Sequence, residues 1–313
     1  MAAPNQVSHK EPTPGSFAAW MACIRPKTLG IAVAPVAVGL SVSAAVTHTF
    51  NISVAVATLL LSILMQSISN MENDAGYTKK KAERSTRKGL PRATANGWLT
   101  VAQVERMIAV FAGIVLIDTA YLIWQGGWVM LAISLASITA AYAYMGGPKP
   151  IAYTPFGELI VFIFFGPVAV CGTYWLQTMT LAIEPFLAGS ALGVIAAGVL
   201  AVNNFRDLHH DQEVGRKTLA VLLGPKLMSK VYCLMLVSGF LLVALMVGLN
   251  PELLFACLVI ICVPKAYRLI RELKIKTGNE LNSVMFGTIK LELLFALTLT
   301  LGCLLSLLFF TVQ

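Results

Sequence analysis

Long, uninterrupted runs of apolar residues are the sequence feature that most limits what this chain can fold into. Nine such runs are separated by short polar or charged segments. A membrane-spanning helix needs about 20 predominantly apolar residues, whereas a spanning strand alternates apolar and polar residues. These runs do not alternate, so we predict an all-α, multi-span membrane protein. The predicted spans lie near residues 28–47, 52–72, 104–124, 127–145, 157–177, 183–205, 228–248, 251–270 and 285–311.

The basic residues are distributed unevenly around these runs. All 23 Lys and Arg residues lie before the first predicted span or in and beside every second connection after it. The connections near 48–51, 125–127, 178–182 and 249–252 contain none. Because basic residues are retained on the cytoplasmic side of a membrane, we predict a cytoplasmic N-terminus and an external C-terminus. The net charge of +8 follows from this asymmetry and does not indicate nucleic-acid binding.

We expect a single domain preceded by a short tail. Residues 1–15 are polar and contain three prolines, which predicts a disordered cytoplasmic tail. Only 12% of the chain is charged and 57% is hydrophobic, whereas soluble domains carry roughly 25% charged residues. Residues 16–313 are therefore predicted to form one nine-helix domain within the bilayer.

Two cytoplasmic connections are long and rich in charge. Each begins with the pattern N-x-x-x-D, from Asn70 to Asp74 in the first and from Asn203 to Asp207 in the second, and each continues into basic residues. The two patterns lie four predicted spans apart. This arrangement favours parallel repeats of one unit, formed by spans 1–4 and spans 5–8.

The second connection places oxygen-bearing side chains at helical spacing. Asn203, Asp207 and Asp211 are four residues apart, which puts them on one face of a continuous helix. Oxygen ligands suit Mg²⁺, which often bridges carboxylates to substrate phosphates. Arg216 and Lys217 follow, and basic side chains would bind the phosphate oxygens that the metal leaves free. The pattern predicts a receptacle for a diphosphate with a long apolar tail.

Charges at the ends of spans also have a simpler explanation, because they anchor helices among lipid headgroups. That explanation is favoured for the run of lysines at 79–81, but not for acids such as Asp207, which membrane topology does not require. His209 and His210 are adjacent, cannot share one helix face and are expected to be solvated. Asp118 lies within the outer half of the third predicted span. A lone acid there is a functional candidate but could equally reach the outer headgroups, and it is not assigned to the site.

Several stretches resemble the UbiA-type intramembrane prenyltransferases, in particular the branch that prenylates 1,4-dihydroxy-2-naphthoate in menaquinone synthesis. "NNFRDLHHDQEVGRKTLAVLLG" (203–224) is similar to the second aspartate-rich motif of that branch. "NMENDAGY" (70–77) is similar to its first motif, and "RPKTL" (25–29) begins the first span as in that branch. "YMGGPKPIAYTPFGELIVFIFFGPVAVCGTYWLQ" (144–177) resembles its central segment.

The resemblance implies nine helices around a central cavity, Mg²⁺ dependence and transfer of a polyprenyl group from polyprenyl diphosphate to an aromatic ring. In that branch the acceptor loses carbon dioxide from the prenylated carbon, and quinone synthesis suggests a bacterial inner membrane. The positions that match the family's ligands for Mg²⁺ and diphosphate are Asn70, Asp74, Asn203, Asp207 and Asp211. The positions that match its basic diphosphate contacts are Arg84, Lys88, Arg92, Arg216 and Lys217.

One part of the first motif departs from the family pattern. Members usually carry a second acid three or four residues after Asp74, where this chain has Tyr77 and Thr78. Glu83 falls where a third acid often lies. The resemblance therefore leaves two alternatives: Asp74 holds the first Mg²⁺ together with Glu83 and water, or that metal is bound weakly.

Two further candidate residues flank the third cytoplasmic loop. Aromatic faces attract cations, so Tyr144 could stabilise the allylic carbocation that forms when the diphosphate departs. A tyrosine at this depth equally suits an interfacial aromatic belt. Lys149 matches a basic residue of the family and would pair with the carboxylate of the acceptor or with the diphosphate.

Three classes of function remain open at the level of sequence. The enzyme is favoured, with 4-hydroxybenzoate or another phenolic ring as the alternative acceptor. A transporter is the second class, because parallel repeats also build carriers, although the polar residues here gather at one membrane face. A non-catalytic lipid-binding relative is the third class, prompted by Tyr77 and Thr78.

Overall fold

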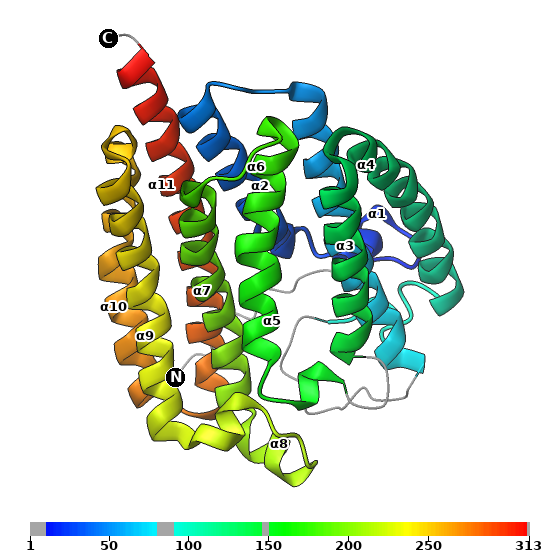
Figure 1. The fold of residues 1–313 in the computed structure, drawn as a ribbon. Helices are drawn as coiled ribbons and strands as arrows, with labels where there is room; N and C mark the ends of the chain where they lie inside the picture. The colour runs from blue at the N-terminus through cyan, green and yellow to red at the C-terminus, as the bar shows by residue number, and fades with distance from the viewer. Residues whose placement is uncertain (1–10, 80–90, 146–149, 312–313) are drawn as a thin grey trace, which may run out of the picture. The chain divides into compact units, whose positions relative to one another are not determined.

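A computed structural model describes residues 11–79, 91–145 and 150–311 of the chain. Every regular element in these ranges is helical (Figure 1), which confirms the predicted all-α class. The elements are α1 (Phe17–Ile24), α2 (Pro26–Thr47), α3 (Ile52–Lys79), α4 (Val101–Met145), η1 (Ile151–Tyr153), α5 (Gly157–Ile163), η2 (Phe164–Val168), α6 (Ala169–Thr178), α7 (Ile183–Arg206), α8 (Leu208–Glu213), α9 (Leu219–Leu249), η3 (Pro251–Cys262), α10 (Val263–Ile275), η4 (Gly278–Glu280) and α11 (Leu281–Thr311).

Eight helical segments within the described ranges are long and apolar enough to cross a membrane. The sequence predicted nine, and the difference arises in α4, which covers the predicted spans 104–124 and 127–145 as one element. α4 is interrupted at Gly127, whose φ of 63° and ψ of −154° are not helical. Glycine adopts such a positive φ without a steric penalty, because it has no Cβ. The break therefore falls where the sequence predicted a connection between two spans.

The contacts divide the chain into two compact units, one of residues 1–29 and 63–117 and the other of residues 30–62 and 118–313. In the first unit, α1 packs its buried Ala19 and Cys23 into a cluster with Met71 of α3. The Ser16 hydroxyl accepts a hydrogen bond from the Ala19 amide and caps the start of α1. α1 ends at Ile24 and is followed by Arg25, which has a left-handed φ of 58°.

In the second unit, α7 is the central helix and packs against α5, η2, α9 and α11 (Figure 1). Glycines permit the closest of these approaches. A Cβ on Gly193 would lie 2.5 Å from the Phe162 carbonyl oxygen and 2.9 Å from Gly166 Cα. Small residues let helix backbones approach closely inside membranes, where van der Waals packing replaces the hydrophobic effect as the driving force.

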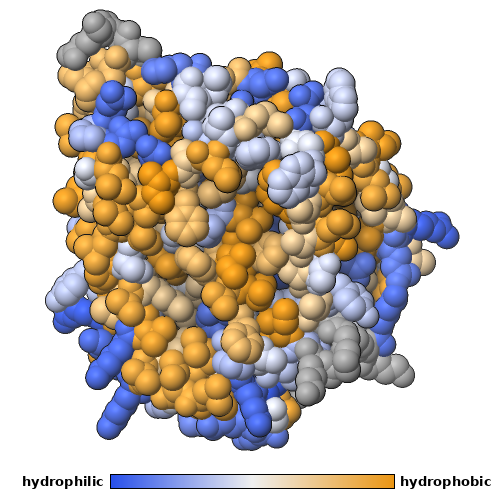
Figure 2. Space-filling model, viewed as in Figure 1, coloured by the Kyte–Doolittle hydropathy of each residue, from blue (hydrophilic) through white to orange (hydrophobic). Residues whose placement is uncertain are grey.

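The outer surface is unusually apolar for a folded chain. Figure 2 shows hydrophobic side chains over most of the face in view, with hydrophilic ones gathered mainly toward its upper and lower ends. Large apolar side chains such as Leu60, Ile117, Leu241 and Ile260 are exposed along the span-length helices. An exposed apolar surface of this extent marks a membrane-facing surface.

Candidate functional site

The first aspartate-containing motif lies in the last turns of α3, in the first unit. Asn70 is buried, and its side-chain amide donates to the Ile24 carbonyl oxygen at 2.7 Å and to the Thr28 hydroxyl at 2.9 Å. Its Oδ1 accepts a long bond from Gln66 at 3.4 Å. Asn70 thus fastens α3 to the junction between α1 and α2, a structural role that sequence reasoning did not identify.

Asp74 is fully buried and binds the backbone of a segment far along the chain. Its two carboxylate oxygens accept from the Ala93 and Thr94 amides, both at 2.9 Å, and from the Thr94 hydroxyl at 2.6 Å. Arg92, which immediately precedes these residues, is buried as well. A carboxylate offers about four acceptor sites, so these bonds leave Asp74 little free capacity in this arrangement.

The second motif lies at the end of α7, in the second unit. Here the structure differs from the expected single helix face, because α7 ends at Arg206 and the backbone of Asp207 is not helical. The Arg206 guanidinium donates to both Asp207 carboxylate oxygens and to Asn203 Oδ1. Arg206 was not among the predicted site residues, although its place directly before Asp207 was a signal that could have identified it.

Asp211, in α8, pairs with a different arginine. Arg216 donates to Asp211 Oδ1 at 2.8 Å and to the Ala152 carbonyl oxygen at 2.8 Å, and its guanidinium carbon lies 4.9 Å from the centroid of the Tyr153 ring. Burial raises the pKa of Asp211 above its ordinary value, against the opposing effect of Arg216. Asp211 Oδ2 and Arg216 Nε are buried without a hydrogen-bond partner among the described residues. These two atoms are suited to a ligand.

A third acid, Glu158 at the start of α5, was missed by sequence reasoning. It is buried, and its Oε1 accepts a hydrogen bond from Asn204 at 3.0 Å. A Cβ on the neighbouring Gly157 would lie 4.0 Å from the hydroxyl oxygen of Tyr144, which is partly buried at the end of α4. One acidic residue in the first turn of a span resembles an ordinary interfacial charge, and no pattern of neighbouring residues distinguishes Glu158 from one.

The remaining predicted residues divide into two groups. Lys217 has an exposed side chain, and its backbone amide donates to the Tyr153 carbonyl oxygen at 2.9 Å. His209 and His210 are exposed, as expected. The predicted residues that lie outside the described ranges are Glu83, Arg84, Lys88 and Lys149.

The donor chemistry of the second motif fits Mg²⁺. Among the described residues, no three His, Cys, Asp or Glu side chains form a metal-binding group. Asn203, Asp207 and Asp211 nevertheless supply amide and carboxylate oxygens, and Asp211 Oδ2 is a buried acceptor without a partner in the described chain. Mg²⁺ is usually held by one or two protein carboxylates and completed by water and substrate phosphates, so a small set of this kind is sufficient.

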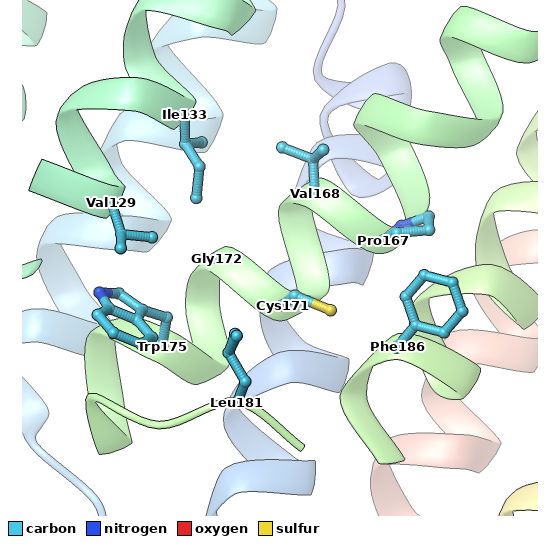
Figure 3. Close-up of a pocket in the computed structure, with 9 residues that line it drawn as sticks. All are labelled: Val129, Ile133, Pro167, Val168, Cys171, Gly172, Trp175, Leu181 and Phe186. Atoms are coloured by element: carbon cyan, nitrogen blue, oxygen red, sulfur yellow. The ribbon is translucent and has the colours of Figure 1, made fainter. Parts of the chain in front are cut away.

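A crevice of about 250 Å³ opens on another part of the second unit (Figure 3). Its lining is apolar and contains no Asp, Glu, Lys or Arg. The residues that line it are Val129, Ile133, Pro167, Val168, Cys171, Gly172, Trp175, Leu181 and Phe186. None of them is a predicted site residue. A space without charged groups cannot bind a diphosphate, so this crevice is not the candidate site.

The chain has apolar spans and a bilayer-facing surface, and its acid–arginine pairs lie at helix ends. These features define a multi-span membrane protein with a polar site. Residues 32–294 match the UbiA prenyltransferase family, and the chain belongs to this family. The family predicted from the motifs is thereby confirmed.

Individual relatives agree with this membership. The chain is 30% identical over 290 residues to a 1,4-dihydroxy-2-naphthoate octaprenyltransferase of Escherichia coli, covering 89% of this chain and 94% of the relative. It is 33% identical over 238 residues to the Mycobacterium tuberculosis enzyme of the same name, covering 74% and 80%. The structure of a UbiA homologue from Archaeoglobus fulgidus bound to DMAPP and Mg²⁺ superposes with a TM-score of 0.62 at 16% identity, covering 91% and 99%. At that identity the likeness establishes the fold.

Proposed function

We propose that this chain transfers a polyprenyl group from polyprenyl diphosphate to 1,4-dihydroxy-2-naphthoate. Carbon dioxide and pyrophosphate are released, and the product is the demethylmenaquinol of menaquinone biosynthesis. The observation that carries this proposal is the match, over most of both chains, to relatives named for this acceptor. The acid–arginine pairs of the second motif supply the groups that a diphosphate substrate requires.

The second motif is proposed to hold the diphosphate end of the substrate. Asn203, Asp207 and Asp211 would hold Mg²⁺, which when bound neutralises charge that develops on the departing diphosphate. Arg216 is already fixed by Asp211 and by the Ala152 carbonyl oxygen. Its planar guanidinium still has a buried Nε–H without a partner in the described chain. An arginine held in this way can donate to phosphate oxygens without reorganising, and preorganised donors stabilise charge best.

The remaining residues are assigned supporting roles. In the first unit, Asn70, Asp74 and Glu83 are proposed to bind metal and diphosphate, with Arg84, Lys88 and Arg92 as basic contacts. Lys217 is proposed as a further phosphate contact and Lys149 as a partner of the acceptor carboxylate or diphosphate. The ring of Tyr144 would stabilise the allylic cation. Apolar walls would exclude the water that otherwise captures that cation.

We further propose nine spans in a bacterial inner membrane, with residues 1–15 as a cytoplasmic tail and residues 16–313 as one domain. The Gly127 break supports two spans within α4, because it separates two apolar stretches of about 20 residues each. The distribution of Lys and Arg supports the cytoplasmic position of the N-terminus.

The proposal is tested with purified protein in detergent, incubated anaerobically with octaprenyl diphosphate, 1,4-dihydroxy-2-naphthoate and Mg²⁺. We expect a prenylated product that has lost carbon dioxide, identified by its mass, and no product after EDTA treatment. Asp207→Asn and Asp211→Asn should abolish turnover while the melting temperature stays close to wild type. Prenylation of 4-hydroxybenzoate but not of the naphthoate would replace the proposed acceptor, and full turnover by either variant would refute the site.

A further inference from the structure

Glu158, in the second unit, has one carboxylate oxygen to which the proposed site gives no role. Glu158 is 3% exposed, and its Oε1 accepts the Asn204 amide at 3.0 Å. Its Oε2 is buried and has no hydrogen-bond partner among the residues that the structure describes. Leaving a buried acceptor unpaired is costly, because the group loses its water without gaining a replacement. Such an atom in a folded site indicates a ligand that supplies a donor.

The neighbours of Glu158 connect it to the proposed site. Asn204, which orients the carboxylate, directly follows Asn203 of the second motif and is itself 5% exposed. A Cβ on the adjacent Gly157 would lie 4.0 Å from the Tyr144 hydroxyl oxygen. Glu158 is therefore linked to the second motif through Asn204 and lies near Tyr144 through Gly157.

The chemistry of Oε2 limits what can bind there. A carboxylate repels a diphosphate and the carboxylate of an aromatic acid, so neither anion is its ligand. A metal ion is already assigned to Asn203, Asp207 and Asp211 in the proposed function, so Glu158 is not needed as its ligand. A hydroxyl group remains, and of the two substrates only the aromatic acceptor carries hydroxyls in the naphthalenediol ring. Its 1-hydroxyl is next to the acceptor's own carboxylate and bonds to it internally, which leaves the 4-hydroxyl as the free donor.

We propose that Glu158 Oε2 accepts a hydrogen bond from the 4-hydroxyl of the aromatic acceptor, and that Glu158 thereby determines which acceptor is selected. This inference rests on the proposed function. A site that provides a buried acceptor for a substrate hydroxyl discriminates strongly against an analogue that lacks the hydroxyl, because the acceptor is then left unpaired. The repulsion between Glu158 and the acceptor's carboxylate turns that carboxylate away and fixes the orientation of the ring.

The test is a double-mutant-type cycle, in which the hydroxyl of the ligand, its partner Glu158, or both are removed and the affinities are compared. Binding of 1,4-dihydroxy-2-naphthoate and of 1-hydroxy-2-naphthoate is measured by ligand fluorescence, without oxygen, for wild type and for Glu158→Gln. A glutamine that keeps the Asn204 bond through its carbonyl presents an amide donor where Oε2 was. Wild type should prefer the diol by roughly 10-fold to 100-fold, as expected for a hydrogen bond to a charged group. In Glu158→Gln the ratio should fall close to one, through weaker diol binding.

Glu184 provides a matched control. It lies in the first turn of α7, and its Oε1 also accepts an asparagine amide, that of Asn250, at 3.0 Å. Glu184→Gln should leave the preference intact. In turnover, Glu158→Gln should raise KM for the naphthoate and leave KM for octaprenyl diphosphate unchanged, with a melting temperature near that of wild type.

The outcomes separate this inference from the function on which it rests. Wild-type turnover of the naphthoate with an undiminished hydroxyl preference in Glu158→Gln overturns the role of Glu158 and leaves the function standing. Equal losses of affinity for both ligands, with a lowered melting temperature, also overturn it, because Glu158 then only joins α5 to α7. Absence of any wild-type turnover of the naphthoate refutes the proposed function itself.

Discussion

Arg206 holds both carboxylate oxygens of the next residue, Asp207, with Nε 2.8 Å from Oδ1 and Nη2 2.6 Å from Oδ2. The same guanidinium donates to Asn203 Oδ1 at 2.9 Å and to Asn282 Oδ1 at 2.6 Å. The Arg206 guanidinium, an internal cation, thus already binds side-chain oxygens that we propose as ligands of Mg²⁺. It also joins the end of α7 to the first turn of α11, so the second motif is held in place before any ligand binds.

Removing this internal cation should strengthen metal binding in the absence of substrate. Arg206→Ala is expected to bind Mn²⁺, as a probe for Mg²⁺, roughly 3-fold to 10-fold more tightly, because a half-exposed charge pair is worth on the order of 1 kcal/mol. Free Mn²⁺ is measured by electron paramagnetic resonance during titration. Arg271→Ala is the control, since that arginine is exposed and its guanidinium carbon lies 5.8 Å from the centroid of the Tyr267 ring. Unchanged or weaker binding by Arg206→Ala would show that Asp207 is not shared with the metal.

Asp74 is expected to stabilise the first unit as well as to contribute to the proposed site. Asp74→Asn replaces one acceptor oxygen by an amide that cannot accept from the backbone, so the free energy of unfolding should fall by about 1.5–3 kcal/mol. Hydrogen exchange at the Ala93 and Thr94 amides, read from peptides by mass spectrometry, should accelerate in the variant. Asp118→Asn is the control, because Asp118 Oδ2 has no partner in the described chain and its removal loses no bond. Unchanged protection of both amides in Asp74→Asn would contradict the assigned role.

The apolar runs predicted the helices well, because a helix that satisfies its own backbone is the simplest way to cross a bilayer. The second motif also lies at the polar end of a span, as expected, but the single helix face predicted from its spacing was wrong, because α7 ends at Arg206 and Asp211 lies in α8. The partners of these residues could not be predicted. Asp74 binds amides 19 and 20 residues away, and Arg206 binds Asn282 across 76 residues. Such pairs are set by tertiary packing, which leaves no periodic signal in a single sequence.

The buried thiol of Cys23 should make the stability of the first unit depend on alkaline pH. Burial, reinforced by the nearby charge of Asp74, raises the pKa of the Cys23 thiol from 9.0 to about 12. The folded state therefore keeps the neutral thiol, whereas the unfolded chain ionises near 9.0. The contribution of the neutral thiol to the free energy of unfolding is complete below the pKa of the unfolded state. It is lost as the pH rises from that pKa to the pKa of the folded state. We expect the free energy of unfolding to fall more steeply over this interval in wild type than in Cys23→Ala.

Chemical labelling gives a second readout of the same property. The thiolate is the reactive form of cysteine, so Cys23 should react slowly with iodoacetamide at pH 8 in the folded protein and rapidly after unfolding. The labelled peptide is quantified by mass spectrometry. Rapid labelling of Cys23 in the folded protein, or identical pH profiles for wild type and Cys23→Ala, would show that the thiol is not buried in solution.

The glycines of α7 should differ sharply in their tolerance of a methyl group. A Cβ on Gly193 would lie 2.5 Å from the Phe162 carbonyl oxygen, whereas one on Gly198 would lie 3.5 Å from Tyr232 Cε2, an ordinary contact. Gly193→Ala must separate α7 from α5 and η2, and overpacking of this kind costs about 1–3 kcal/mol. Gly198→Ala adds helix propensity without a clash and should stay within about 1 kcal/mol of wild type. Unfolding in mixed detergent micelles by SDS titration measures both. Equal effects of the two substitutions would mean that α7 does not pack against α5 at the observed distance.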